Sequence, residues 1–271
     1  MNKNILILGN GFIGQNLYRY FSNRHNTSIS NKSDIDITDI YSVKNYLHNK
    51  NFDYIIYAIG IKNINQCEQY PDIAYSVNAD GVKNILNYLD GSSKLIYIST
   101  DYVFDGTDGD YSESSTCNPT TVYGKSKLLG EHYALKYNNS IVVRTSGVYG
   151  KFCLWLNDLI KCLSEKKNIV CFSDIYNSPT YVINLAEMID DIINIDYTGT
   201  INLNGDTKNN RYDLYSSVAT IFERDLNLLS SGFSNGNFPK DISLNNGLYK
   251  SLIKKSPNTT IKGLMRFKDE Y

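Results

Sequence analysis

The sequence predicts an α/β protein in which helices cover both faces of a doubly wound parallel sheet, with a smaller C-terminal lobe. Two observations predict this class. Short apolar runs such as "NILILG" and "DYIIYAIG" end in glycine, which is typical of strands buried on both faces. Strand and helix signals then alternate over roughly the first 145 residues, and this alternation favours right-handed parallel crossovers.

The elements of the first part follow one another in a regular order. The strand "NILILG" precedes the helix "FIGQNLYRYF", which places Ile13, Leu17 and Phe21 on one face. A weak strand, "NTSIS", and a polar segment, "NKSDIDITDI", come next. The strand "DYIIYAIG", the helix "DIAYSVNADGVKNILNYL" and the strands "KLIYIST" and "SIVVRTS" complete the expected sheet. A helix that contains Tyr123 and Lys127 separates the last two strands.

The pattern is looser after Gly150. "LWLNDLIKCLSEKK", "YVINLAEMIDDII" and "RYDLYSSVATIF" indicate helices, and "NIVCF" and "TINLNG" indicate strands. We therefore expect a main domain over residues 1–148 and a smaller lobe over residues 149–271 that shares some elements with the main sheet.

Composition and charge argue against several classes of function. The chain has 271 residues, of which 42% are hydrophobic and 20% charged, and its formal net charge is −1. Because both signs of charge are scattered, no nucleic-acid partner is expected. The apolar runs are too short to span a bilayer, and "MNKN" leads directly into a strand. We therefore expect no membrane segment, no signal peptide and a cytoplasmic location.

Metal chemistry is not expected either. The five cysteines include no Cys-x-x-Cys pair, and no nearby histidine completes a zinc pattern, so we expect free thiols. The stretch "DIDITD" brings Asp34, Asp36 and Asp39 close together, yet it completes no strong ligand pattern.

A glycine-rich loop between the first strand and the first helix predicts a dinucleotide site. In "ILILGNGFIGQNL", Gly9 permits a tight turn, Gly11 lets backbone amides approach a pyrophosphate, and Gly14 lets the helix pack closely on the strand. The helix N-terminus adds N–H groups and partial positive charge for the phosphates. A glycine turn without a ligand is the alternative, but the position directly after a buried strand favours binding. The first part is therefore expected to be a dinucleotide-binding Rossmann domain, and the second mainly a substrate-binding lobe.

The end of the second strand bears on which dinucleotide binds. An acidic residue roughly 20 positions beyond the glycine motif would hold the hydroxyls of an adenosine ribose. The chain instead has Ser30, Asn31 and Lys32 there, and hydroxyl, amide and ammonium groups suit a 2′-phosphate. We therefore expect NADP(H) in preference to NAD(H), which stays an alternative.

Two Tyr-x-x-x-Lys pairs occur in a chain of 23 tyrosines, so at least one is expected to be accidental. In each pair the two side chains would lie one helical turn apart on the same face. Tyr46 and Lys50 precede the strand "DYIIYAIG". In an open parallel sheet ligands bind beyond the carboxyl ends of the strands, and this first pair has no reason to reach them. We therefore interpret Tyr46 and Lys50 as a surface coincidence.

The second pair falls where a ligand is expected. Tyr123 opens the helix after "KLIYIST", and the end of that strand brings Ser99, Thr100 and Asp101 to the same edge of the sheet. Neighbouring residues of an extended chain point to opposite sides, so Ser99 and Thr100 cannot both face a substrate.

Carbonyl reduction needs this combination of groups. A carbonyl that receives a hydride becomes an alkoxide, and Tyr123 can protonate it. The Lys127 ammonium is expected to lower the tyrosine pKa and to hold the nicotinamide ribose. The Thr100 hydroxyl is expected to orient the carbonyl oxygen. Tyr123, Lys127 and Thr100 are therefore the predicted catalytic residues.

Three motifs, "GNGFIG", "STDYVFDG" and "VYGKSKLLGE", together resemble the extended short-chain dehydrogenase/reductases, and within them the dTDP-4-dehydrorhamnose reductase family. "CEQYPDIAYSVNADGVKNI", "RTSGVYG", "SDIYNSPTYVINLAEMI", "GTINLNG" and "ISLNN" extend the resemblance over almost the whole chain. It implies NAD(P)H-dependent reduction of the 4-keto group of a dTDP-linked 4-keto-6-deoxy hexose, in deoxysugar and polysaccharide biosynthesis.

The resemblance also implies roles for individual residues. It implies cofactor contacts from Gly11, Phe12 and Ile13 at the pyrophosphate, from Asp36 and Ile37 at the adenine end, and from Ala58, Ile59, Gly60 and Lys127. With the residues predicted from the sequence pattern, the full set of expected cofactor contacts also contains Gly9, Gly14, Ser30, Asn31, Lys32 and Ser99. Substrate contacts would come from Thr100, Asp101, Tyr102, Tyr123 and Gly147.

The departures from the family pattern lie mainly on the substrate side. Gly147 stands where the family has Trp, "DIYNSPT" replaces "DQ-x-GSPT", and Phe238 precedes Pro239 where the family has Arg. The glycine loop is also one residue shorter than the usual one. The carrier nucleotide therefore stays open between dTDP, UDP, GDP and CDP.

Three other functions compete with reduction as interpretations of the sequence. A dehydratase would carry Glu after the Thr-Asp pair, where this chain has Tyr102. An epimerase would use the same Tyr and Lys but return the hydride. A non-catalytic subunit resembling the regulatory subunit of methionine adenosyltransferase would instead bind a partner enzyme. A homodimer is one assembly that we consider for the chain.

Overall fold

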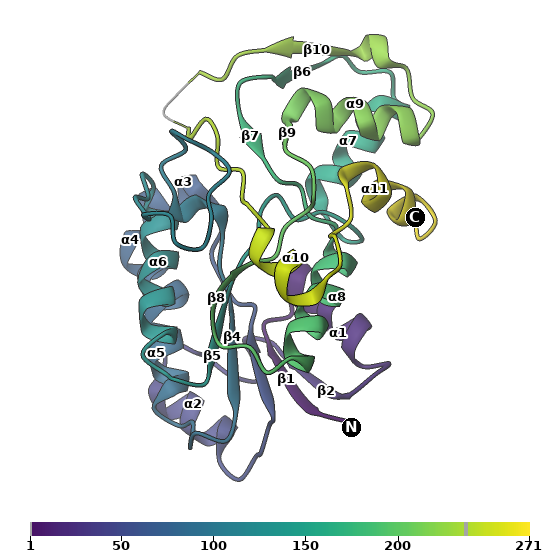
Figure 1. The fold of residues 1–271 in the computed structure, drawn as a ribbon. Helices are drawn as coiled ribbons and strands as arrows, with labels where there is room; N and C mark the ends of the chain where they lie inside the picture. The colour runs from purple at the N-terminus through teal and green to yellow at the C-terminus, as the bar shows by residue number, and fades with distance from the viewer. Residues whose placement is uncertain (1, 236–237) are drawn as a thin grey trace. The chain divides into compact units, whose positions relative to one another are not determined.

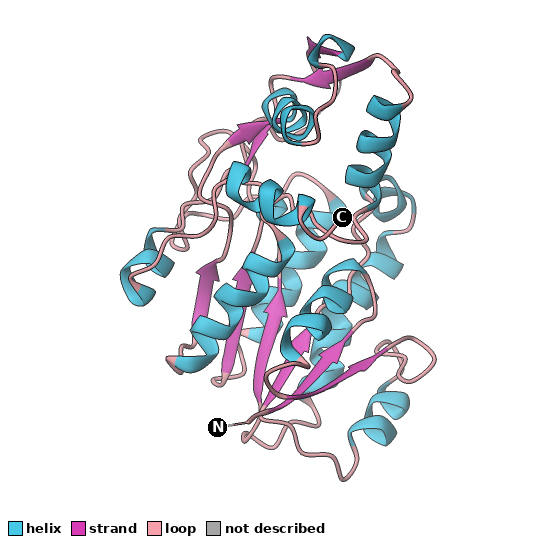
Figure 2. Ribbon diagram, turned by 90° about the vertical axis from the view of Figure 1, so that its right-hand side faces the viewer, coloured by secondary structure: helices cyan, strands magenta, loops and turns pink. Residues whose placement is uncertain are grey.

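The computed structural model describes residues 2–235 and 238–271 and is built around a six-stranded sheet (Figure 1). In sheet order, the strands are β2 (Asn26–Ser30), β1 (Asn4–Leu8), β3 (Tyr54–Tyr57), β4 (Lys94–Ile98), β5 (Ser140–Arg144) and β8 (Gly199–Asn202). The pairs from β2 to β5 are all parallel, and Figure 2 shows their arrows pointing in a common direction. The predicted parallel sheet is confirmed.

Helices cover both faces of this sheet. The helices of the first part are α1 (Phe12–Phe21), α2 (Ile40–Leu47), α3 (Ile64–Gln69), α4 (Pro71–Tyr75), α5 (Gly81–Leu86) and α6 (Val122–Ala134). In Figure 1, α2, α5 and α6 lie along one face and α1 lies on the other. Every residue of β4 and β5 is buried, which explains why these strands are continuous apolar runs in the sequence.

The strand order places a crevice at one edge of the sheet. From β1 the chain goes to β2 on one side, whereas β3 and β4 lie on the other side of β1. Ligands of open α/β sheets bind beyond the carboxyl ends of the strands at such a reversal. Gly9, Ala58 and Ser99 directly follow β1, β3 and β4, so they lie at that edge.

The helix predicted from Asp72 to Leu89 is interrupted. It consists of α4, a π-helix η1 (Ser76–Asp80) and α5. Two buried tyrosine hydroxyls donate to backbone carbonyls of η1: Tyr57 to Val77, at 2.7 Å, and Tyr97 to Asn78, also at 2.7 Å. Hydrogen bonds from outside a helix disturb its regular ladder, and they account for the wider turn here.

The chain divides into two compact units. The first contains residues 1–104, 116–144 and 192–201, and the second contains residues 105–115, 145–191 and 202–271. The boundary that we expect at residue 148, with its assignment of binding roles to the two parts, stays a prediction.

The later elements belong mainly to the second unit. They are α7 (Leu154–Ser164), β6 (Ile169–Phe172), β7 (Tyr176–Asn177), α8 (Val182–Asn194), β9 (Asn209–Asn210), α9 (Arg211–Ile221), β10 (Leu229–Gly232), α10 (Gly247–Ile253) and α11 (Thr260–Lys268). β6 pairs with β10 in parallel, and β7 pairs with β9 antiparallel. Two 3-10 helices, η2 (Asp101–Val103) and η3 (Leu226–Leu228), complete the described elements.

Two observations bear on the expected environment of the protein. The five cysteines are free thiols, as predicted. Over the described ranges, no helix combines the length and the apolar character that a membrane span requires.

Candidate active site

The glycine loop has the geometry that the sequence predicts. Gly9 has a φ of +108°, a region that favours glycine, and α1 begins at Phe12 directly after Gly11. A Cβ on Gly14 would lie 1.8 Å from the carbonyl oxygen of Gly9, so only glycine allows α1 to approach β1 this closely. A Cβ on Gly11 would meet nothing within 4 Å. The loop therefore forms a cradle that leaves room for a ligand beside Gly11.

A cavity of about 290 Å³, which we call the glycine-loop cavity, lies beside this cradle. It is lined by residues that follow β1, β2 and β3: Gly9, Asn10, Gly11, Asn31, Lys32, Ile35, Asp36, Ile37, Thr38, Ala58, Ile59, Gly60 and Val77. Nine of these are predicted cofactor residues, and they include Asn31 and Lys32 but not Ser30 of the three residues expected near a 2′-phosphate. The Thr38 hydroxyl and backbone N–H donate to Asp36 and lower the pKa of its carboxyl group.

A second cavity of about 160 Å³, the tyrosine cavity, continues from the first. It is lined by Gly11, Phe12, Ile13, Ala58, Ile59, Gly60, Lys62, Ile98, Ser99, Tyr123 and Lys127. The two cavities share Gly11 and residues 58–60, so the glycine loop and the Tyr-x-x-x-Lys pair lie along one continuous groove.

Tyr123 lies in the first turn of α6. Thr121 caps this helix by accepting a hydrogen bond from Gly124, which places the phenol at the helix N-terminus. The ring meets Tyr102 edge to face, with centroids 5.6 Å apart. Burial raises the pKa of Tyr123, and the Asp101 carboxylate raises it further, whereas a hydrogen bond with Thr100 lowers it. The phenol is therefore protonated throughout the neutral pH range.

Lys127 lies one turn further along α6 and is only 3% exposed. Its Nζ donates to the carbonyl oxygen of Ile98 at 2.6 Å and lies 4.0 Å from the centroid of the Tyr97 ring. Burial lowers the pKa of Lys127 to about 7, against the opposite effect of the Glu131 carboxylate.

The predicted lowering of the tyrosine pKa by this lysine is not seen in the free chain, and the effect of a charged Lys127 on the phenol stays a prediction. Burial raises the pKa of Tyr123, and Thr100 is the group that lowers it. The physical reason is the order of titration. Because Lys127 has a pKa of about 7, it has lost its proton before the buried phenol ionises and has no charge left to stabilise the phenolate.

The three residues after β4 take different positions. The Ser99 side chain lines the tyrosine cavity and donates its hydroxyl to Glu131. The Thr100 hydroxyl donates to Asp101 at 2.9 Å and also bonds the phenol of Tyr123. Thr100, Asp101 and Tyr102 thus surround Tyr123 without lining the tyrosine cavity. Ser99 and Thr100 face different partners, as alternation along an extended chain predicts.

The remaining predicted positions lie outside the groove. Gly14 and Ser30 line neither cavity. Ser30 is buried beneath the groove, and Gly14 lies against the Gly9 carbonyl. Tyr46 and Lys50 also line neither cavity, and they form a cation–π pair in which Lys50 Nζ lies 3.6 Å from the ring centroid.

Sequence reasoning missed Asn78, which braces the groove from η1. Its side chain accepts from the Ile61 backbone N–H at 2.8 Å and donates to the Ser126 hydroxyl at 2.9 Å, so it ties the loop after Gly60 to α6. No local pattern signals this role, because the π-turn that presents the side chain depends on distant tyrosines. Cavity residues Asn10, Ile35, Thr38, Lys62, Val77 and Ile98 were missed as well.

Gly147 lines a separate cavity in the second unit. This cavity has a volume of about 160 Å³ and is lined by Gly147, Trp155, Ile175, Asn177, Arg211, Leu214 and Tyr215. Trp155 and Tyr215 stack with ring centroids 5.9 Å apart, and the Arg211 guanidinium donates to the Tyr215 hydroxyl at 3.4 Å. An aromatic wall is therefore present beside Gly147, although the residue itself has no side chain.

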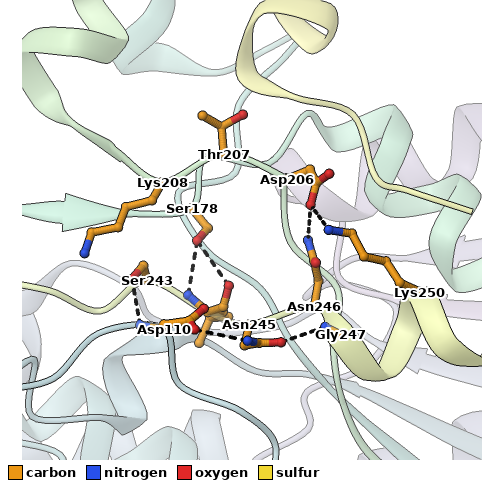
Figure 3. Close-up of a pocket in the computed structure, with 12 residues that line it drawn as sticks. Asp110, Ser178, Asp206, Thr207, Lys208, Ser243, Asn245, Asn246, Gly247 and Lys250 are labelled. Carbon is orange, nitrogen blue, oxygen red and sulfur yellow. Dashed lines mark hydrogen bonds and ion pairs between the residues drawn. The ribbon is translucent and has the colours of Figure 1, made fainter.

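A further cavity of the second unit is polar, and Figure 3 shows hydrogen bonds and ion pairs between several of its lining residues. Asn245 joins Asp110 to the Gly247 backbone, and Asp206 accepts from Asn246 at 3.2 Å and pairs with Lys250. Because these groups already satisfy each other, we interpret them as a structural network that holds the loops of this unit together.

The groove of the first unit fits a dinucleotide. The open space at Gly11, the N–H groups at the start of α1 and the polar residues after β2 match the pyrophosphate and adenosine ends of such a molecule. Among the described residues, no three His, Cys, Asp or Glu side chains come together as a metal site would require.

Comparisons with known proteins agree with this geometry. Residues 3–236 match the family model described as the RmlD substrate binding domain. The chain is 33% identical over 162 residues to the spore coat polysaccharide biosynthesis protein SpsK of Bacillus subtilis, covering 58% of this chain and 57% of that protein. It is 25% identical over 250 residues to methionine adenosyltransferase 2 subunit beta of Bos taurus, covering 82% and 72%.

A solved structure covers more of the chain. It is the dTDP-4-dehydrorhamnose reductase of Bacillus anthracis in complex with NADP, which has a TM-score of 0.94 and 26% identity and covers 100% of both chains.

Proposed function

The chain belongs to the family of the RmlD substrate binding domain, and on that premise we propose that it is an oxidoreductase that reduces the 4-keto group of a nucleotide-linked 4-keto-6-deoxy sugar with NADPH. The observation that carries this proposal is the tyrosine cavity, where Tyr123 and Lys127 lie beside the glycine loop in one groove. The name of the Bacillus anthracis relative supports the reaction and a dTDP-linked substrate. The name of SpsK supports a place in polysaccharide biosynthesis.

In this mechanism Tyr123 is the proton donor. When bound, NADPH would supply the hydride for C4 of the sugar, and the phenol of Tyr123 would give its proton to the C4 oxygen. The Thr100 hydroxyl, which lies beside the phenol and donates to Asp101 in the free chain, would stabilise the phenolate by turning its proton from Asp101 to the phenolate oxygen. Lys127, which lines the tyrosine cavity, would hold the nicotinamide ribose and would contribute positive charge when it is protonated.

Different residues of the groove are proposed to contact different parts of the cofactor. We propose that Gly11, Phe12 and Ile13 hold the pyrophosphate and that residues 58–60 and Ser99 flank the inner half. The adenosine end would lie against Asn31, Lys32, Asp36 and Ile37. NADPH is favoured over NADH because Lys32 offers a positive charge to the 2′-phosphate and no carboxylate directly follows β2 to hold a free ribose.

Gly147 stays a predicted substrate contact, and the cavity beside it lies within the second unit. Trp155 and Tyr215 offer an aromatic face to a planar ring, and Arg211 offers positive charge to a phosphate. Thr100, Asp101 and Tyr102 would contact the sugar next to Tyr123. A cytoplasmic location and a homodimer stay predictions from the sequence.

A non-catalytic regulatory role is the second candidate. It is favoured by the match to methionine adenosyltransferase 2 subunit beta, which covers 82% of this chain. A regulatory protein with this groove is expected to bind NADPH without consuming it.

The test follows the absorbance of NADPH and NADH with a panel of dTDP-, UDP-, GDP- and CDP-linked 4-keto-6-deoxy sugars. We expect turnover with at least one sugar and a fall in kcat of about 10²–10⁴ for Tyr123→Phe, because the proton donor is lost. Tyr46→Phe is the matched control, since Tyr46 belongs to the other Tyr-x-x-x-Lys pair and lies outside the groove, and it should keep wild-type kcat. Cofactor binding without consumption on every sugar would support the regulatory role instead.

A further inference from the structure

A buried ion pair lies directly behind the tyrosine cavity. The Glu131 carboxylate is 1% exposed and accepts from Arg144 through Nη2 at 2.7 Å and through Nε at 3.1 and 3.2 Å. The guanidinium also donates to Cys117 Sγ at 3.1 Å and lies 5.2 Å from the centroid of the Phe104 ring. Nothing in the proposed mechanism uses this pair, although burying two charges is costly unless they are well matched.

Two connections join the pair to the site. Glu131 is the third member of a stripe on α6, in which Tyr123, Lys127 and Glu131 follow at four-residue steps and so share one face. The Ser99 hydroxyl, which belongs to the wall of the tyrosine cavity, donates to the same carboxylate. The carboxylate is therefore placed between the cavity on one side and the guanidinium on the other.

We propose that Glu131, balanced by Arg144, is a positioning residue that sets the charge on Lys127 and thereby the electrostatic state of the cofactor groove. The effect on cofactor binding and reduction rests on the proposed function. The effect of Glu131 on the charge of Lys127 is a property of the free chain. Glu131 acts through Lys127 and Ser99 and touches neither cofactor nor substrate.

The charges around Lys127 support this assignment. Glu131 is the neighbouring charge that opposes the effect of burial on the pKa of Lys127. Other titratable groups near this part of the site are Tyr97 of β4, Tyr123 of α6, Asp101 of η2, Cys67 of α3 and Lys62 of the cavity wall. Among the described residues, Glu131 is the carboxylate whose charge acts on Lys127 against the effect of burial, so it is the group that helps Lys127 to keep its proton.

If the Glu131–Arg144 ion pair had only a structural role, its two single variants would behave differently from what we propose. If the pair only tied α6 to β5, removing either partner would loosen the same contact and move every property of the site in the same direction. An electrostatic device predicts opposite effects. Removing the carboxylate leaves a buried positive charge beside Lys127 and favours its neutral form. Removing the guanidinium leaves an uncompensated negative charge and favours the ammonium form.

The test measures the titration of Lys127 in the full chain without cofactor or substrate. Trace acetylation between pH 5.5 and 10.5, quantified by mass spectrometry for individual lysines, gives the midpoint at which the amine becomes reactive. Lys125 is the internal control, because it is exposed on the same helix. We expect Glu131→Gln to lower the Lys127 midpoint by about one pH unit or more and Arg144→Met to raise it by about one unit. The double variant should return to within about half a unit of wild type.

Shifts in the same direction for both single variants, or no shift in either, would overturn the proposal.

If a single variant does not fold by circular dichroism, Ser99→Ala replaces it. That change withdraws one donor from the carboxylate, strengthens its field at Lys127 and should raise the midpoint by a few tenths of a unit. An unchanged or lowered midpoint in Ser99→Ala would equally overturn it. Because acetylation needs no turnover, these results stand whether or not the chain reduces a sugar.

Discussion

The packing around Lys127 determines its protonation state, and this protonation state is expected to affect cofactor binding. The amine lies in a nearly closed environment between the Ile98 carbonyl and the Tyr97 ring. With a pKa of about 7, roughly half of it is neutral at neutral pH in the free chain. The ribose hydroxyls of a nicotinamide dinucleotide accept hydrogen bonds, so binding should favour the protonated ammonium.

Cofactor binding is therefore expected to take up a proton. Near pH 8 the free amine is mostly neutral, and binding should draw close to one proton from the buffer, whereas at pH 6 the amine is already charged and uptake should be small. The affinity for NADPH should accordingly fall as the pH rises above 7, by up to about tenfold per unit. Calorimetry in two buffers of different ionisation enthalpy measures the uptake.

Lys127→Met is the control for this experiment, since a side chain without an amine cannot take up the proton. Uptake at pH 8 that persists in Lys127→Met would assign the titration to another group. Proton release on binding at pH 8 to the wild-type chain would contradict the proposed contact with the ribose.

Among the elements, the turn from β1 into α1 contains two glycines, Gly11 and Gly14, that have different roles. Gly14 lies in the packing contact between helix and strand, and Gly11 lies at the open cradle. The sequence spacing predicts both duties, because the order of turn, cradle and packing contact is local. The π-helix η1 is different, since the tyrosine hydroxyls that widen it come from β3 and β4.

Substituting each glycine with alanine should separate stability from binding. Gly14→Ala places a methyl group 1.8 Å from the Gly9 carbonyl oxygen, so we expect a loss of at least about 2 kcal/mol in the free energy of unfolding. Gly11→Ala meets nothing within 4 Å and should cost less than about 1 kcal/mol, but the methyl group enters the cradle and should weaken NADPH binding. Urea unfolding and NADPH fluorescence titration measure the two effects. Equal destabilisation by both variants, or unaltered binding to Gly11→Ala, would contradict these assignments.

For the whole molecule, the sequence predicts those features that depend on residues close together in the chain. Buried parallel strands are continuous apolar runs, so the strands and the glycine loop were predicted where they lie. Tyr123 was separated from Tyr46 because only one of them follows a strand end at the binding edge. The Glu131–Arg144 pair and the bond from Asn78 to Ser126 join segments far apart in the chain, and no local pattern reveals them.

The direction of the tyrosine pKa shift could not be predicted for a related reason. Spacing along a helix indicates that an ammonium and a phenol are neighbours, but burial decides which of them loses its proton first. That burial is produced by the closed packing of β4, η1 and α6 around the pair.

The most direct test of the proposed reaction follows the hydride itself. Deuterated NADPH, labelled at the transferable position, is incubated with the dTDP-linked 4-keto-6-deoxy sugar, and the product is analysed by mass spectrometry and NMR. The account predicts one deuterium at C4 of the reduced sugar, with one NADPH consumed for each sugar, and a label that is nearly lost with Tyr123→Phe. Bound NADPH that transfers no deuterium, or a label that returns to the cofactor with no net reduction, would contradict it.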